Sequence, residues 1–189
     1  MINKLFNWIN ELIKSDPIQD NQKYVTYAIN KIYSNDSEIF ANFNLDNSSE
    51  LIINLIRSAT TRIDISIVNS NLMFNESILS HLKYKSLEFK RLNGLIRILN
   101  FDHTINDKVV KFCNENYPCL VRCVNKNNET SLYNNYVIID AKKYYLVNQT
   151  HTNDDIKLTF NRAEICANGV LKASALTRNF EELFYKEDK

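Results

Sequence analysis

The sequence has very little glycine and proline, with two residues of each among 189. Gly94 and Gly169 cannot build a GxGxxG dinucleotide loop, a phosphate-binding P-loop or a GxSxG nucleophile elbow. The 23 basic and 22 acidic residues leave a net charge of only +1. The chain as a whole therefore has no electrostatic preference for nucleic acid or an anionic membrane, although a local basic patch remains open.

Long apolar runs are absent as well. No stretch approaches the roughly 18 uninterrupted apolar residues that a membrane span needs. The first residues, MINKLFNWINELIK, carry charges at Lys4, Glu11 and Lys14 and have no small-residue cleavage site. We expect no membrane span, no signal peptide and a cytoplasmic location. With 44% hydrophobic and 24% charged residues, the composition is typical of one globular domain, with or without a small appendage.

Three of the four cysteines, Cys113, Cys119 and Cys123, are close in sequence, and Cys166 stands apart. Their spacing contains no CxxC knuckle, which makes a structural zinc site an unfavoured alternative. Cys119 and Cys123 fall in an expected strand, on one face. We interpret the cysteines as inert, buried core thiols and expect neither a metal nor a cofactor.

Apolar residues at helical spacing predict two N-terminal helices, one over residues 2–13 and one over 20–33. The Asp16-Pro17 step separates them, because a residue before proline avoids the α region. We expect this helical hairpin (1–36) to precede the main domain (37–189). Three arrangements of this hairpin are open. It could pack on the core of the domain, form an interface with a partner or a second copy, or anchor the protein at a membrane surface. The Asn-rich polar face of the first helix argues against the anchor.

From residue 37 onward, strand and helix patterns alternate. Segment 62–68 (RIDISIV) has period two, with Ile63, Ile65 and Ile67 on one face. Asn47 and Glu50 have capping-box spacing before a helix, and Thr104 is the expected N-cap of another. This order predicts an α/β fold with a mixed, largely parallel sheet flanked by helices. The remaining expected strands are 38–43, 95–99, 120–124, 136–140, 144–148 and 162–167, and the remaining expected helices are 75–91, 104–112 and 171–184.

The last third of the chain contains the segments NNYVIIDAKKYYLVNQT, FNRAEICANG and LTRNFEELF, and LIINLIRSATTRIDISIV lies upstream. The first three segments resemble the C-terminal half of a phospholipase D-like domain, and the upstream segment resembles that family's opening helix and strand. The resemblance covers roughly residues 37 to 186 and follows the order of the elements. The layout is also similar to a small bacterial group of phospholipase D-like domains that lack the active-site signature.

The active-site signature of that family, HxKxxxxD followed by GSxN, is altered here. Aligning its aspartate with Asp140 places Tyr133 at the histidine and Asn135 at the lysine. The second part of the signature falls on 147–150, which includes Asn148 and Thr150. The resemblance implies a histidine nucleophile, a lysine that holds phosphate oxygens and an aspartate that orients the site.

The replacements remove the chemistry that each position requires. Tyr133 is a phenol with a reference pKa near 10, so it is a poor nucleophile at neutral pH without an activating base. Asn135 carries no charge to stabilise a developing oxyanion. We therefore expect a non-catalytic binding, scaffold or regulatory module. The alternatives are a phosphate-ester hydrolase of altered mechanism, which uses His103 or His151 near Asp140, and a nucleic-acid-binding accessory protein.

Other polar residues give weaker signals. Asp102 and His103 follow a strand at the edge where α/β sheets bind ligands, and they either support acid–base chemistry or cap the loop. His151 with Asn148, Thr150 and Tyr133 would line a polar pocket for a small anion or nucleotide. Arg162 and Glu164 share a strand face, as an ion pair in the former cleft or as a solvent-facing pair.

Two further points concern decoy motifs and partners. His81-Leu82-Lys83 spells HxK but falls in an expected helix, so we interpret it as a solvated helix face. The family resemblance implies a homodimer, because single-motif members commonly pair across the active-site face. An unidentified protein partner is also expected. Nucleic acid stays open as a partner but is unsupported, since no aromatic run is interleaved with Arg and Lys.

Overall fold

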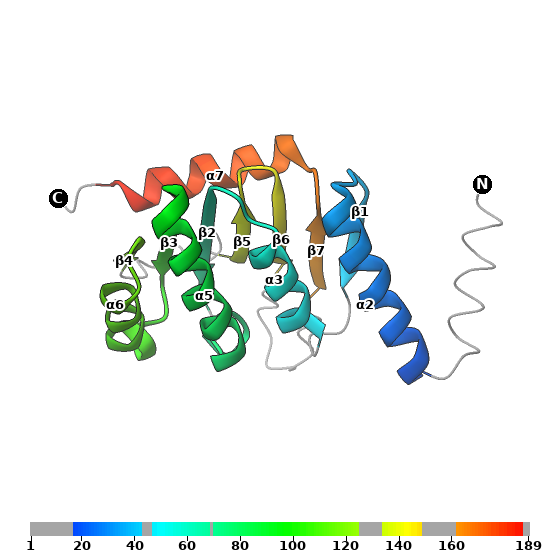
Figure 1. Cartoon of the computed structure of the whole chain (residues 1–189), viewed down its shortest axis with the longest axis horizontal. Helices are drawn as coiled ribbons and strands as arrows, with labels where there is room; N and C mark the ends of the chain where they lie inside the picture. The colour runs from blue at the N-terminus through cyan, green and yellow to red at the C-terminus, as the bar shows by residue number, and fades with distance from the viewer. Residues whose placement is uncertain (1–16, 43–46, 69, 125–133, 149–161, 187–189) are drawn as a thin grey trace, which may run out of the picture.

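The computed structural model describes residues 17–42, 47–68, 70–124, 134–148 and 162–186 (Figure 1). The predicted first helix, 2–13, lies outside these residues. The described helices are α2 (Pro17–Ser34), α3 (Ser48–Arg57), α4 (Ser70–Met73), α5 (Glu76–Leu92), the 3-10 turn η2 (His103–Ile105), α6 (Asn106–Glu115) and α7 (Val170–Phe184). The strands are β1 (Ile39–Asn42), β2 (Arg62–Ile67), β3 (Leu95–Asn100), β4 (Cys119–Cys123), β5 (Asn135–Ile139), β6 (Lys143–Asn148) and β7 (Arg162–Cys166).

The seven described strands form one mixed sheet in the order β1-β7-β6-β5-β2-β3-β4. The α/β architecture with a mixed sheet is as predicted, but the expectation of a largely parallel sheet was wrong. Only β2, β3 and β4 run parallel, joined by helical crossovers, while the other neighbouring pairs in this sheet are antiparallel. The physical reason is the antiparallel pairing of β5 with β2, which ends the parallel part of the sheet, and the β5–β6 hairpin then continues the antiparallel order.

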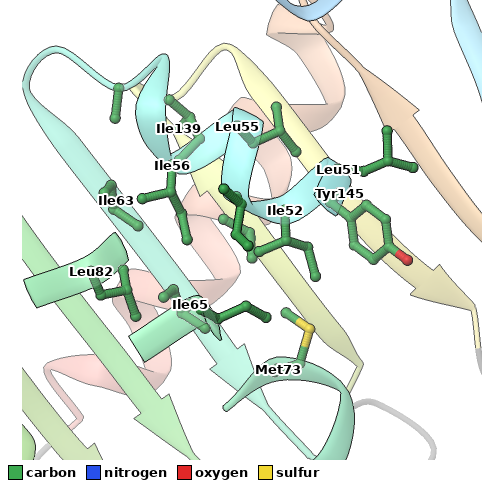
Figure 2. Close-up of a cluster of buried hydrophobic side chains, with 14 of the residues drawn as sticks. Leu51, Ile52, Leu55, Ile56, Ile63, Ile65, Met73, Leu82, Ile139 and Tyr145 are labelled. Carbon is green, nitrogen blue, oxygen red and sulfur yellow. The ribbon is translucent and has the colours of Figure 1, made fainter. Parts of the chain in front are cut away.

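One face of the sheet packs against α2, α3, α5 and α6, which lie side by side in Figure 1. The period-two pattern of β2 places Ile63, Ile65 and Ile67 in this core, as predicted. Helix α3 lies over the centre of the sheet, where Leu51, Ile52, Leu55 and Ile56 point toward β2, β5 and β6 (Figure 2). This apolar layer is the main source of hydrophobic stabilisation.

Helix α2 belongs to this packing. Val25, Ala28 and Ile32 of α2 are buried in the same core. The ammonium of Lys143 donates to the Ile32 carbonyl oxygen at 3.1 Å, and the Tyr24 hydroxyl donates to the Ala41 carbonyl oxygen at 2.7 Å. Of the three alternatives for the N-terminal hairpin, its second helix therefore takes the core-packing one. The domain boundary at residue 36 stays a prediction.

The opposite face of the sheet is covered by α7, which runs crosswise to the other helices (Figure 1). An ion pair is buried there: Arg97 of β3 donates to both carboxylate oxygens of Asp64 on β2, at 2.7 and 2.9 Å. The Arg97 guanidinium also lies 5.0 Å from the ring centre of Phe180 and reaches Glu181 at 3.2 Å. This network fixes α7 on the sheet through paired charges.

Two predicted helix caps differ from the structure. Asn47 makes no side-chain cap bond to α3 but pairs with Asn21 of α2 instead. Thr104 lies inside the short turn η2, and Asp102 is its N-cap. Among the described helices, none is long and apolar enough to cross a membrane.

Candidate functional site

The edge of the sheet where the altered motif begins is formed by the ends of several strands. The register pairs Tyr136 of β5 with Ser66 near the end of β2, and Ile67 of β2 with Asn100 at the end of β3. The start of β5 therefore lies beside the carboxyl ends of β2 and β3. This is the edge at which open α/β sheets bind ligands.

Asn135, which stands at the lysine position of the motif, is the first residue of β5 and is completely buried. Its Oδ1 accepts a hydrogen bond of 2.8 Å from the backbone N–H of Val68, just beyond the end of β2. One residue earlier, the Asn134 carbonyl oxygen accepts from the Ser66 hydroxyl at 2.9 Å. The side chain thus joins β5 to β2, in an uncharged arrangement.

Asp140 lies at the far end of β5, away from Asn135. Its carboxylate accepts five hydrogen bonds of 2.8–2.9 Å from the turn between α3 and β2: from the backbone N–H groups of Thr60, Thr61 and Arg62 and from both threonine hydroxyls. Burial opposes ionisation, but these donors outweigh it and lower the pKa of the Asp140 carboxyl. Asp140 therefore closes a turn.

Asp102 and His103 lie just after β3, on the same edge as Asn135. The Asp102 carboxylate accepts from the backbone N–H of Ser70 and of Thr104, both at 3.1 Å, and from the Thr104 hydroxyl at 2.5 Å. Partial burial opposes ionisation, but the bonds from Thr104 and Ser70 hold the pKa of Asp102 below its ordinary value. Asp102 thus performs the predicted loop-capping role, and His103 is exposed.

The hydrolase alternative requires His103 to lie close to Asp140, but the strand register places these two residues far apart. Asp140 is level with the beginning of β2, because Ile139 pairs with Ile63. His103 follows the end of β3, whose last residue, Asn100, is level with Ile67 at the end of β2. His103 and Asp140 therefore lie at opposite ends of the strands, so the alternative in which His103 works near Asp140 does not fit the structure.

The remaining predicted site residues fall partly outside the described structure. Tyr133, Thr150 and His151 lie outside the described residues. The backbones of Asn148 on β6 and Arg162 on β7 are paired with each other, and the neighbouring pair of β6 with β5 joins Val147 to Asn135. The register therefore brings Asn148 and Arg162 to the same sheet edge as Asn135.

Glu164 lies two residues further along β7, on the face that α7 covers. Its carboxylate accepts from Lys172 of α7 at 2.6 Å and from the Tyr144 hydroxyl. Burial, followed by the bond to Glu164, raises the pKa of Tyr144 well above its ordinary value. These contacts tie β6, β7 and α7 together.

A cavity of about 460 Å³ between α3 and α5 was not predicted from the sequence. Its lining includes Arg57, His81 and Lys85. The HxK segment lies in helix α5, as predicted, and His81 is partly exposed there. His81 Nε2 lies 2.8 Å from Arg57 Nη2, and Nδ1 lies 2.8 Å from the Ser77 carbonyl oxygen. A neutral ring with its hydrogen on Nδ1 satisfies both partners. The sequence feature that could have indicated this cavity is the row of polar side chains at residues 81, 84, 85 and 88, which share one face of the helix.

The cysteines follow the expectation in part. Cys113, Cys119 and Cys166 are buried, but Cys123 is exposed, so the prediction that it faces the core was wrong. The reason is that β4 is the last described strand of the sheet and Cys123 is its final residue, paired with β3 on one side. Among the described residues, no group of three His, Cys, Asp or Glu side chains is arranged to hold a metal ion.

Comparison with known proteins supports the fold. No protein-family model and no curated protein matches the sequence. Among solved structures, the chain is similar to Nuc, a phospholipase D family member from Salmonella typhimurium, at 11% identity, with a TM-score of 0.54 over 77% of this chain and 92% of that one. NucT from Helicobacter pylori is 11% identical, with a TM-score of 0.57 over 77% and 93%.

A third similar structure is that of TrmBL2, an archaeal chromatin protein with a novel mode of DNA binding. It is 10% identical, with a TM-score of 0.56, and the match covers all of this chain and 67% of that one. At these identities the likeness concerns the fold. The chain therefore has a phospholipase D-like fold, as its sequence resemblance implied.

Proposed function

We propose that this protein is a non-catalytic module of phospholipase D-like fold, which binds a ligand or partner and has a scaffold or regulatory role. The observation that carries the proposal is the state of Asn135. The resemblance implies a lysine at this position, whose charge holds phosphate oxygens. Here a neutral amide is buried at the start of β5 and hydrogen-bonded to the Val68 backbone. Without that cation, the charge that develops on a phosphoryl group has no fixed partner at this position.

The retained aspartate does not weaken this proposal. Asp140 is the one residue of the HxKxxxxD signature that the sequence keeps, and on its own it suggests catalysis. Its carboxylate is instead engaged by five donors of the turn before β2. A fold-stabilising role accounts for its presence without any chemistry.

The proposal is tested by a hydrolysis assay on bis-p-nitrophenyl phosphate and single-stranded DNA. The matched control is the triple variant Tyr133→Phe/His103→Ala/His151→Ala, which removes the nucleophile candidates that the sequence offers near this edge. We expect wild type and triple variant to give the same rate as buffer. Hydrolysis by the wild type that the triple variant loses would overturn the proposal in favour of an enzyme of altered mechanism.

Nucleic-acid binding is the second candidate function, and the similarity to TrmBL2 favours it, because that protein binds DNA. Fold similarity alone does not transfer function. The test is fluorescence anisotropy of labelled single- and double-stranded DNA at several salt concentrations. A salt-dependent affinity would support this candidate, since phosphate contacts release counterions. Absence of binding at low salt would leave a small molecule or a protein as the ligand.

Homodimerisation is the remaining proposal about partners. It rests on the resemblance, since single-motif phospholipase D-like domains commonly pair across the active-site face. Light scattering coupled to size-exclusion chromatography measures the mass in solution. A mass near twice 22.1 kDa supports the dimer, and 22.1 kDa contradicts it.

A further inference from the structure

The buried thiols of Cys113 and Cys119 contact one another directly. Cys113 lies in α6, near its end, and Cys119 is the first residue of β4. Their Sγ atoms are 2.7 Å apart, and both side chains are almost fully buried, with exposed fractions of 4% and 6%. This separation is far shorter than the usual contact of two unbonded sulfur atoms. It lies within an ångström of a disulfide bond, about 2.05 Å.

We propose that Cys113 and Cys119 form a reversible disulfide under a two-electron oxidant such as hydrogen peroxide, which makes the pair an oxidative modification site. The bond would join the end of α6 to the edge strand β4. The backbone already holds the two sulfurs in contact, so bond formation needs only a small movement. The site is separate from the sheet edge that carries Asn135 and does not depend on what the protein binds.

The reaction balances without a group from elsewhere in the protein. Hydrogen peroxide transfers one oxygen to the first thiol, which becomes a sulfenic acid, and water leaves. The second thiol attacks that sulfur, forms the S–S bond and releases a second water. The two sulfurs lose two electrons in total, and the peroxide takes them up. A dithiol such as dithiothreitol reverses the step by thiol–disulfide exchange.

The surroundings of the two thiols limit the rate at which they oxidise. The contact with Cys113, followed by burial, raises the pKa of Cys119. Because the thiolate is the reactive form, we expect oxidation to be slow and to require local opening of the structure around the pair. Tyr117, in the segment that joins the two cysteines, is 69% exposed. Cys123 is exposed, and its pKa is raised by partial burial of the thiol and by Cys113, so Cys123 must be removed from the assay.

The chain offers a clean readout for the pair. Trypsin cleaves after Lys111 and Arg122, and the peptide between them, FCNENYPCLVR, contains Cys113 and Cys119 alone. Cys123 and Cys166 fall in other tryptic peptides. A disulfide between the pair therefore lies within one peptide and lowers its mass by two hydrogen atoms.

The experiment uses the full chain with Cys123→Ser, treated with hydrogen peroxide, denatured, alkylated with iodoacetamide and digested. We expect the peptide to lose two hydrogens and to escape alkylation, and dithiothreitol to restore both. The thermal midpoint of the oxidised protein should rise, because the disulfide restricts the unfolded chain. The rise should be only a few degrees, because the loop that the disulfide closes is short. Cys123→Ser/Cys119→Ser is the matched control, whose folding is checked by circular dichroism.

Two results would overturn the proposal. The first is a peptide that is fully alkylated at both cysteines after prolonged oxidation of the folded protein. The second is a peptide that gains oxygen atoms on each sulfur in place of losing hydrogens, since thiols in contact condense before further oxidation.

Discussion

Replacement of Asp140 by asparagine tests most sharply how the altered motif is used. Among the described residues, the hydrogen bonds of this carboxylate all come from the turn of Thr60, Thr61 and Arg62 between α3 and β2. Asp140 itself has a φ of 53°, in the left-handed region. Asparagine tolerates this conformation nearly as well as aspartate, so Asp140→Asn changes the hydrogen bonds and leaves the backbone in place.

The size of the effect follows from the five hydrogen bonds. With its oxygen at the Oδ1 position, asparagine keeps the three bonds from Thr61 and Arg62 and loses the two bonds from Thr60 to Oδ2. A hydrogen bond to a charged group contributes about 1.5–3 kcal/mol. Since the carboxylate is only half-buried and water replaces part of this loss, we expect the free energy of unfolding to fall by about 2–4 kcal/mol.

The stability lost in Asp140→Asn should also depend on pH. The pKa of Asp140 is lowered in the folded protein, because its donors outweigh the effect of burial. Its contribution to stability is therefore fully present above the unfolded-state pKa, about 3.9, and is lost as the pH falls through the lower folded-state pKa. The difference in stability between wild type and Asp140→Asn should narrow below about pH 4.

Urea unfolding followed by far-ultraviolet circular dichroism, at pH 7 and at pH 3, measures both effects. Glu182→Gln is the matched control, since it makes the same carboxylate-to-amide change at an exposed position of α7. We expect that control to stay within about 0.5 kcal/mol of wild type. If Asp140→Asn is equally close to wild type at pH 7, the carboxylate does not hold the turn and the reasoning fails.

Three further substitutions probe the site edge and both cores. Asn135→Lys places an ammonium group where a buried amide now lies, and thermal unfolding should show a loss of about 3 kcal/mol or more. Arg97→Met removes the bidentate partner of Asp64, and the free energy of unfolding in urea should fall by a similar amount. The double variant Asp64→Asn/Arg97→Met should recover most of that stability. Gly94→Ala brings a Cβ within 2.4 Å of the buried Phe89 ring and should cost about 1–3 kcal/mol in urea. A wild-type midpoint in any of these variants contradicts the packing described for that position.

The strands and helices were largely predictable, because their signals are local. The alternation of Ile63, Ile65 and Ile67 identifies β2, and the turn at Ala141-Lys142 identifies the β5–β6 hairpin. The antiparallel pairing of β5 with β2 was not predictable, since it joins segments some seventy residues apart with no local signal. That pairing decides the sheet type, and the expectation of a largely parallel sheet failed there.

Only part of the candidate site could be predicted from the sequence. The motif alignment placed Asn135 one residue before the expected strand 136–140, and the structure makes it the first residue of β5. The role of Asp140 was not predictable, because its donors lie about eighty residues earlier. The Asp64–Arg97 pair was missed for a related reason: each residue interrupts an apolar strand, but only the register of β2 with β3 shows that they face each other.

The contact of Cys113 with Cys119 also required the structure. Five residues separate the two cysteines in the sequence, and this spacing fits inert thiols as well as a bonded pair. The turn between α6 and β4 brings the two sulfurs to 2.7 Å. Sequence spacing alone does not fix that approach.

We propose that this phospholipase D-like fold does not cleave phosphodiesters, and a single-turnover experiment is the most sensitive test of that proposal. Protein in excess is incubated with end-labelled single-stranded DNA, and the label is followed both in cleaved DNA and, after quench in alkaline detergent, in covalent attachment to protein. Excess protein reveals even one slow turnover. We expect intact DNA and no labelled protein. Cleavage or a covalent adduct that disappears in the Tyr133→Phe/His103→Ala/His151→Ala variant would contradict it.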